Sequence, residues 1–179
     1  MSPAGVVTTI HSFNDCNTTN DGSNPSASLI QGSDGNFYGT TAAGGSAEAG
    51  TVFKMTPAGV VTVLHSFHDC SVANDGSNPF ASLVQGSDGN FYGTTVNGGA
   101  ANGGTVFKMT PAGEVTILHS FYDCSVANDG AEPYASLIQG SDGNFYGTTI
   151  AGGSAGWGTV FEVTPAGVVT TLTSSLSNP

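Results

Sequence analysis

Short apolar segments alternate with segments rich in glycine, proline, aspartate and asparagine along the whole chain. Apolar residues nowhere recur at the three- and four-residue spacing of a helix. Between two of the apolar segments, Asp88 and Gly89 form a strong hairpin signal. Residues 111–113 (PAG) form a second tight turn, since proline presets φ at its first central position. The pattern predicts four antiparallel strands, at residues 81–87, 90–95, 104–110 and 114–121.

Apolar side chains occur at consecutive positions within these predicted strands. Val106 is followed by Phe107, and Ile117 by Leu118. Because successive strand residues point to opposite faces of a sheet, both faces are apolar. This is typical of sheets that are covered on both sides, as the blades of a propeller are.

The four-strand pattern occurs three times at a constant spacing of 54 residues. The sequence GSDGNFYGTT occupies residues 32–41, 86–95 and 140–149. A strand-rich repeat of about this length predicts a propeller blade, whereas the coils of a β-solenoid are shorter and lack paired tight turns. We therefore expect an all-β fold, a β-propeller-type repeat with three four-stranded blades per chain and a spare outer strand. The expected parts of this single repeat domain (1–179) are an N-terminal outer strand and link at 1–26, blades at 27–67, 81–121 and 135–173, and a tail at 174–179.

In such a blade the two tight turns lie at one end, and the two long loops lie at the other. Loops on a rigid scaffold commonly carry function, so a binding site is expected at the long-loop end. The candidate ligand-binding residues there are Asp69, Asn74, Asp75, Asn78 and Trp157. Trp157 replaces Gly103 and Ala49 of the other repeats; it could stack on a sugar ring, although a blade-edge or subunit contact is the favoured interpretation.

The long link before each blade clusters oxygen-bearing side chains near glycine, which is the environment that Ca²⁺ prefers. The spacing departs from the alternating pattern of known calcium loops, and such residues equally stabilise turns. We therefore expect no cofactor, with calcium as the alternative. The candidate calcium ligands are Asp15, Asp21, Asp69, Asp75, Asp123 and Asp129.

Two other repeated residue types are interpreted as structural. His11, His65 and His119 each stand two residues before a phenylalanine in a predicted strand, a packing position rather than a metal site. The three cysteines occupy one equivalent position per repeat, so they cannot pair within a repeat, and we expect free, partly buried thiols. Because each feature is repeated, catalytic residues are not expected.

Composition excludes several partners. The net charge is −11, with Lys54 and Lys108 as the only cations, so nucleic acid and anionic lipid are unfavourable partners. No apolar run reaches the length of about 20 residues that a membrane helix needs. Residues 1–3 lead directly into the repeat, without the basic and apolar regions of a signal peptide.

Together, the motifs GTVFKMTPAG, LHSF, DGSNP and GSDGNFYGTT resemble the GloVer-type tandem repeat of bacterial proteins. The resemblance covers essentially the whole chain. It implies a propeller-like domain, usually in a secreted or cell-surface protein, with no established enzymatic activity. The link before DGSNP is longer here and carries the cysteine, and members of the family usually have more copies of the repeat.

The repeat count raises the question of how the ring closes, because propellers have about four to eight blades. Residues 3–13 and 165–173 both carry the fourth-strand motif, but only the first keeps His-Ser-Phe. We expect the N-terminal copy to seal a ring formed by homo-oligomers, a homodimer in preference to a homotrimer. The hypothesis is a non-enzymatic binding or structural module; alternatives are a lectin-like carbohydrate binder with one shallow site per blade and, more weakly, a hydrolase or lyase with a site on the axis.

Overall fold

A computed structural model describes residues 5–14, 20–68, 70–122 and 125–172 of the chain. Each repeat forms one four-stranded antiparallel sheet with its strands in chain order, so the three predicted blades are confirmed. The described residues contain no helix, and hence none long and apolar enough to cross a membrane. Blade 1 comprises β1 (Ile30–Gln31), β2 (Phe37–Thr41), β3 (Thr51–Met55) and β4 (Val61–Ser66); blade 2 comprises β6 (Val84–Gln85), β7 (Phe91–Thr95), β9 (Thr105–Met109) and β10 (Val115–Ser120); blade 3 comprises β12 (Ile138–Gln139), β13 (Phe145–Thr149), β15 (Thr159–Val163) and β16 (Val169–Thr171).

The first strand of each blade is much shorter than the sequence predicts. In blade 2 only Val84 and Gln85 pair with β7, although residues 81–87 were expected to form a strand. The preceding residues contact the neighbouring blades instead. Thr40 Oγ1 of blade 1 donates to the carbonyl of Ala81, and the Ser82 amide donates to Ser136 Oγ of blade 3. This segment therefore joins blades rather than extending a ladder.

The tight turns form as predicted. Asp88 Oδ1 accepts a hydrogen bond from the Asn90 amide at 3.1 Å, and the Gly89 amide donates to the carbonyl of Gly86 at 2.9 Å. Gly89 has a φ of 81°, in the left-handed region that favours glycine. The turn thus depends on the backbone freedom of Gly89.

The long loops carry strands that the sequence analysis missed. The link pairs with the loop after the second strand in two small sheets, β5 (Gly76–Ser77) with β8 (Asn97–Gly98) and β11 (Gly130–Ala131) with β14 (Ala151–Gly152). A Cβ added to Gly98 would lie 2.7 Å from the Cα of Gly76. The backbones approach this closely because both residues are glycine. The pairing also shows that the long loops share one end of each blade.

Successive blades pack through the same two apolar faces. We call the face toward the following blade the leading face, with Tyr38 and Val52 in blade 1, and the face toward the preceding blade the trailing face, with Leu83 and Phe91 in blade 2. These residues lie in one buried cluster, in which the rings of Tyr38 and Phe91 are 4.1 Å apart. Blade 2 meets blade 3 in the same way, with the Tyr92 and Phe145 rings 3.8 Å apart.

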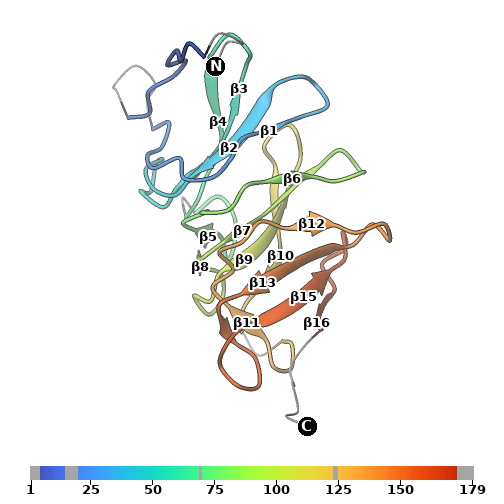
Figure 1. The fold of residues 1–179 in the computed structure, drawn as a ribbon. Helices are drawn as coiled ribbons and strands as arrows, with labels where there is room; N and C mark the ends of the chain where they lie inside the picture. Colours follow the sequence, from blue (N-terminus) through green and yellow to red (C-terminus); the bar gives the residue numbers. More distant parts are fainter. Residues whose placement is uncertain (1–4, 15–19, 69, 123–124, 173–179) are drawn as a thin grey trace.

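The two outermost faces are not covered by a blade. Figure 1 shows blade 1 and blade 3 at opposite ends of the molecule, with blade 2 between them. On the trailing face of blade 1, Leu29 is 45% exposed, whereas its equivalents Leu83 and Leu137 are 3% exposed. On the leading side of blade 3, Val160 is 37% exposed, against 0% for the equivalent Val106. The described chain is an open arc of blades.

The spare outer strand lies beside blade 1 but is not part of a sheet. Residues 5–12 form no strand ladder with the rest of the described chain. The Phe13 ring lies 4.9 Å from that of Phe53 in β3, close to the 5.3 Å between Phe67 and Phe107 one repeat later. The segment therefore takes the place of the fourth strand of a preceding blade.

Candidate functional site

A buried histidine–aspartate pair lies at the long-loop end of blade 1 and of blade 2. In blade 1, Nε2 of His65 lies 2.9 Å from Oδ2 of Asp75, and both side chains are buried. Asp75 also accepts hydrogen bonds from the amides of His68 and Gly76, each at 2.9 Å. The His65 ring meets the Phe67 ring edge-on, with centroids 4.8 Å apart. The pair therefore ties the link to the end of the fourth strand.

Equivalent pairs occur in blade 2 and between the N-terminal segment and the first link. His119 Nε2 lies 3.0 Å from Asp129 Oδ2, and His11 Nε2 lies 2.8 Å from Asp21 Oδ2. The sequence analysis interpreted the histidines as packing residues and missed their partners. The signal was present, because an aspartate follows each of these histidines after ten residues.

The pairing engages half of the candidate calcium ligands. Asp21, Asp75 and Asp129 are buried, and their carboxylates accept hydrogen bonds from the protein. No cluster of three or more potential metal ligands occurs among the residues that the structure describes. The other candidates, Asp15, Asp69 and Asp123, lie outside the described residues.

Two equivalent pockets lie beside these pairs, which we call the loop pockets. The first has a volume of about 260 Å³. The second has a volume of about 360 Å³. In both, a link asparagine (Asn74 or Asn128) and the paired aspartate contribute to the lining. Residues of the first pocket are His68, Cys70, Val72, Asn74, Asp75 and Gly99, and those of the second are Tyr122, Val126, Asn128, Asp129 and Gly153.

The cysteine expectation differs from the structure at Cys70. Its thiol is free and exposed at the first loop pocket rather than partly buried. Cys70 has a φ of 70°, so the link turns sharply there and leaves the side chain outside the core. Cys16 and Cys124 lie outside the described residues.

The remaining ligand-binding candidates lie at the joins between blades. The Asn78 amide donates to the carbonyl of Ala49 in the preceding blade at 2.7 Å, and its Nδ2 donates to the carbonyl of Ala42 at 2.9 Å. Trp157 is 90% exposed and occupies the position of Ala49 in blade 3. Of the five candidates, only Asn74 and Asp75 line the same pocket. Asp69 lies outside the described residues.

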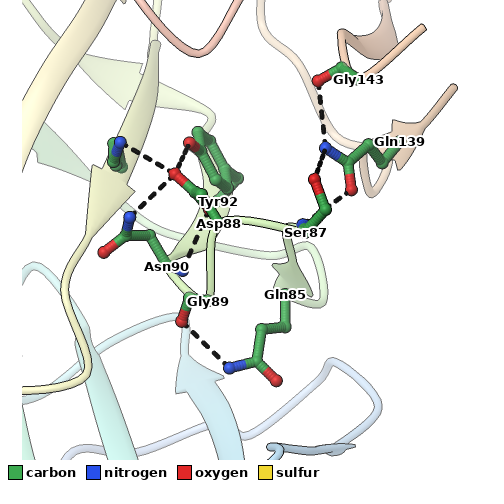
Figure 2. Close-up of polar contacts among 9 residues, drawn as sticks. Gln85, Ser87, Asp88, Gly89, Asn90, Tyr92, Gln139 and Gly143 are labelled. Atoms are coloured by element: carbon green, nitrogen blue, oxygen red, sulfur yellow. Dashed lines mark hydrogen bonds and ion pairs between the residues drawn. The ribbon is translucent and has the colours of Figure 1, made fainter. Parts of the chain in front are cut away.

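A second set of polar contacts joins the blades near their tight turns. The Ser87 amide donates to Oε1 of Gln139 at 2.9 Å, and Nε2 of Gln139 lies 3.3 Å from Ser87 Oγ (Figure 2). Gln85 makes the same two contacts with Ser33, at the same distances. Blades 2 and 3 thus each hold the turn of the preceding blade through one glutamine. The sequence analysis did not identify this contact, because it assigned Ser87 and Gln85, the equivalent of Gln139, to one predicted strand at residues 81–87.

The adjacent turn carries a strongly bonded carboxylate. Asp88 accepts hydrogen bonds from Tyr92 Oη and Asn90 Nδ2, each at 2.8 Å, as Figure 2 shows, and pairs with Lys108 Nζ at 3.0 Å. Burial raises the pKa of Asp88, but the hydrogen bonds from Asn90, Tyr92 and Lys108 outweigh it and hold the pKa well below 3.8. In blade 1, burial together with the bond to Asp34 raises the pKa of Tyr38 to about 12. At neutral pH, Asp88 is therefore ionised and Tyr38 is neutral.

Similar folds occur among solved structures. The chain resembles streptogramin B lyase with a TM-score of 0.54 at 19% identity, covering 84% of this chain and 40% of that one. It resembles a gluconolactonase of Xanthomonas campestris with a TM-score of 0.55 at 11% identity, covering 86% of this chain and 49% of that one. The chain thus spans less than half the length of either protein. At these identities the likeness shows a β-propeller-like fold and nothing about activity.

The sequence itself identifies the family. No curated protein sequence matches this chain significantly. A family model described as the Gloeobacter/Verrucomicrobia repeat matches residues 1–128, which include the first two blades. Since the match spans well over half of the chain, and the third blade repeats the same motifs, the protein belongs to the Gloeobacter/Verrucomicrobia repeat family.

Proposed function

We propose that this protein is a non-enzymatic structural and binding module that closes its ring by assembling with a second copy. The observation that carries the proposal is the match between its two uncovered faces. The leading face of blade 3 and the trailing face of blade 1 are the same two faces that pack together twice within the chain. A second copy therefore provides a trailing face for the leading face of blade 3 and a leading face for the trailing face of blade 1.

The polar contacts across these joins support the same assembly. Within the chain, Gln85 and Gln139 each hold the serine of the preceding turn. Gln31 and Ser141 are the equivalent residues on the two uncovered faces, and both are exposed. In the proposed assembly, Gln31 of one copy binds Ser141 of the other, and Tyr146 packs on Phe37.

The size of the related folds favours a homodimer of six blades over a homotrimer of nine. The aligned region covers 40% and 49% of the two solved structures. Two copies therefore supply about the length of one such protein, whereas three copies exceed it. Closure also removes the uncovered blade faces, which would otherwise remain prone to aggregation.

The arrangement of the polar residues supports a non-enzymatic role. The histidine–aspartate pairs recur at the 54-residue spacing, and the buried aspartates accept hydrogen bonds from backbone amides of the link, as expected for anchors. The weaker alternative, a hydrolase or lyase with a site on the axis, has only the fold of its structural neighbours in its favour. Turnover of a lactone or ester that depends on one repeat alone would support that alternative.

A lectin-like function is the second candidate, and the loop pockets favour it. They recur in two repeats, and Tyr122, which lines the second, is exposed and could stack on a sugar ring. Binding on a glycan array that is lost in Tyr122→Ala and retained in Tyr134→Ala would support this function. Tyr134 is a suitable control because it is an exposed tyrosine that does not line either loop pocket.

Mass in solution tests the assembly. We expect light scattering to give twice the mass of the chain, and Ile150→Asp to give a monomer. Ile150 is 57% exposed, whereas the equivalent Val96 is 2% exposed, so a following blade covers this position. Val168→Asp is the matched control, because Val168 and its equivalent in blade 1, Val60, are both exposed.

The only tryptophan gives a second readout. Trp157 is at the leading side of blade 3, so its emission should shift to shorter wavelength as the protein concentration rises and the copies associate. A monomer at all accessible concentrations would contradict the proposal.

A further inference from the structure

Resting on the proposed assembly, we infer that the ring closes by strand exchange. Residues 7–12 of one copy become the fourth strand of blade 3 in the other copy and replace its β16. Blade 3 is then built from two chains. Four features of the described residues support this arrangement.

The N-terminal segment already lies where a fourth strand lies relative to the next blade. An added Cβ at Gly113 would lie 2.7 Å from the carbonyl oxygen of Leu64, which is on the fourth strand of the preceding blade. At Gly59, one repeat earlier, an added Cβ would lie 3.0 Å from the carbonyl oxygen of Ile10. Ile10 thus occupies the position of Leu64 without a blade behind it.

The segment also keeps the anchors of a complete fourth strand. His11 binds Asp21, and Phe13 packs against Phe53, as His65 and Phe67 do with their own partners. These contacts hold the segment to the link and to the trailing face of blade 1. What the segment lacks within the described chain is a third strand to pair with.

β16 is the counterpart of this strand in blade 3. Its described residues pair opposite Val163, Glu162 and Phe161, and the Leu172 amide donates to the carbonyl of Val160. The equivalent β10 continues to His119 and Ser120, opposite β9. The sequence has Thr173 and Ser174 at these two positions, so the histidine anchor is missing. In the part of the chain that the structure describes, the hydroxyl of Thr171 is buried without a hydrogen-bond partner.

A pocket between the segment and blade 1 marks the place of the missing leading face. It has a volume of about 380 Å³ and is lined by Ile10 on one side and by Leu29, Phe53 and Met55 on the other. One repeat later, the corresponding Leu64, Leu83, Phe107 and Met109 belong to one core cluster with Val52. Val160 of the other copy is the equivalent of Val52, and it would fill this pocket.

The register of the exchanged strand follows from blade 2. There Val115 lies opposite Met109, Thr116 opposite Lys108 and His119 opposite Val106. The equivalent pairs are Val7 with Val163, Thr8 with Glu162 and His11 with Val160. Directly opposite residues in an antiparallel pair have Cβ atoms about 4.5–5.5 Å apart, so paired cysteines can report the register.

Disulfide trapping tests the exchange in a chain whose three native cysteines are replaced by serine. Thr8→Cys and Glu162→Cys are made in separate preparations, which are mixed, dissociated, reassociated and oxidised. We expect a covalent dimer joining one chain of each kind. The control mixes Thr62→Cys, which is exposed and lies on β4 of blade 1, with Glu162→Cys and should give little covalent dimer.

A second variant distinguishes strand exchange from assembly alone. Thr170 lies opposite Glu162 within one chain. A disulfide between Thr170→Cys and Glu162→Cys in one chain therefore shows that β16 still pairs with β15. We expect this pair to crosslink poorly in the assembled protein. Efficient formation of this disulfide within one chain, in protein that light scattering shows to be dimeric, would overturn the strand exchange and leave the proposed assembly intact. A monomeric mass would instead overturn the proposed function.

Discussion

Gln139 Oε1 accepts a hydrogen bond from the Ser87 amide across the join between blades 2 and 3. The two residues are 52 positions apart, and the contact recurs between Gln85 and Ser33. Gln31 occupies the same position on the uncovered trailing face, where its Nε2 donates to the carbonyl of Gly35 in its own turn. This glutamine is therefore available for the join that the proposed dimer requires.

Gln31→Ala should weaken the dimer about thirtyfold, because each of two equivalent joins loses hydrogen bonds worth about 1 kcal/mol. The dissociation constant can be measured by sedimentation at several concentrations. Gln85→Ala is the matched variant, since it removes the same side chain from a join within the chain. It should lower the melting temperature and leave the dimer affinity unchanged; the reverse pattern would contradict the assignment of the two joins.

Asp75→Ala should destabilise the protein by about 3 kcal/mol, since it leaves His65 and two backbone amides without their acceptor. Urea unfolding measures the free energy of unfolding. Thr62→Ala, at an exposed strand position, should change it by less than about 0.5 kcal/mol. An Asp75→Ala effect as small as that of Thr62→Ala would show that the buried pair is not an anchor.

Replacing either of two glycines in one hairpin by alanine should destabilise the protein, for a different physical reason in each case. Gly89→Ala should cost about 1 kcal/mol from backbone strain alone, because a Cβ there has no atom within 4 Å while φ is 81°. Gly93→Ala should cost about 2 kcal/mol from overpacking, because its Cβ would lie 2.6 Å from Phe107 Cζ. Chemical denaturation of both variants checks the values, and equal stability of Gly89→Ala and wild type would contradict the turn assignment.

The sequence predicted the features that depend on local chemistry. The repeat spacing and the turn residues at Gly89 and Pro111 were sufficient to predict the number of blades and the four strands in the sheet of each blade. The contact of Gln139 with Ser87 was beyond this reasoning, because it depends on the angle between blades, which periodicity does not determine. The pairing of Gly76 with Gly98 was missed for a related reason, since two-residue strands between loops carry no apolar pattern.

Acid should destabilise the protein partly through Asp88. The pKa of Asp88 lies below its value of about 3.9 in an unfolded chain, so its contribution to stability is present above about pH 4 and is lost as the pH falls through the folded pKa. Melting temperatures between pH 7 and pH 2 should therefore fall less steeply in Asp88→Asn than in wild type. Glu114→Gln, which removes an exposed carboxylate, should retain the wild-type slope. A steeper fall in Asp88→Asn would contradict the depressed pKa.

Removing the two ends of the chain should have unequal consequences. Deleting residues 1–13 removes His11 and Phe13, which bind Asp21 and Phe53, and uncovers more of the trailing face of blade 1. Deleting residues 174–179 leaves every strand of blade 3 in place. We expect the first deletion to yield a monomer with a lower melting temperature and the second to keep the dimer, as light scattering and thermal unfolding will show. Equal losses from both deletions would mean that the N-terminal segment does not seal the ring.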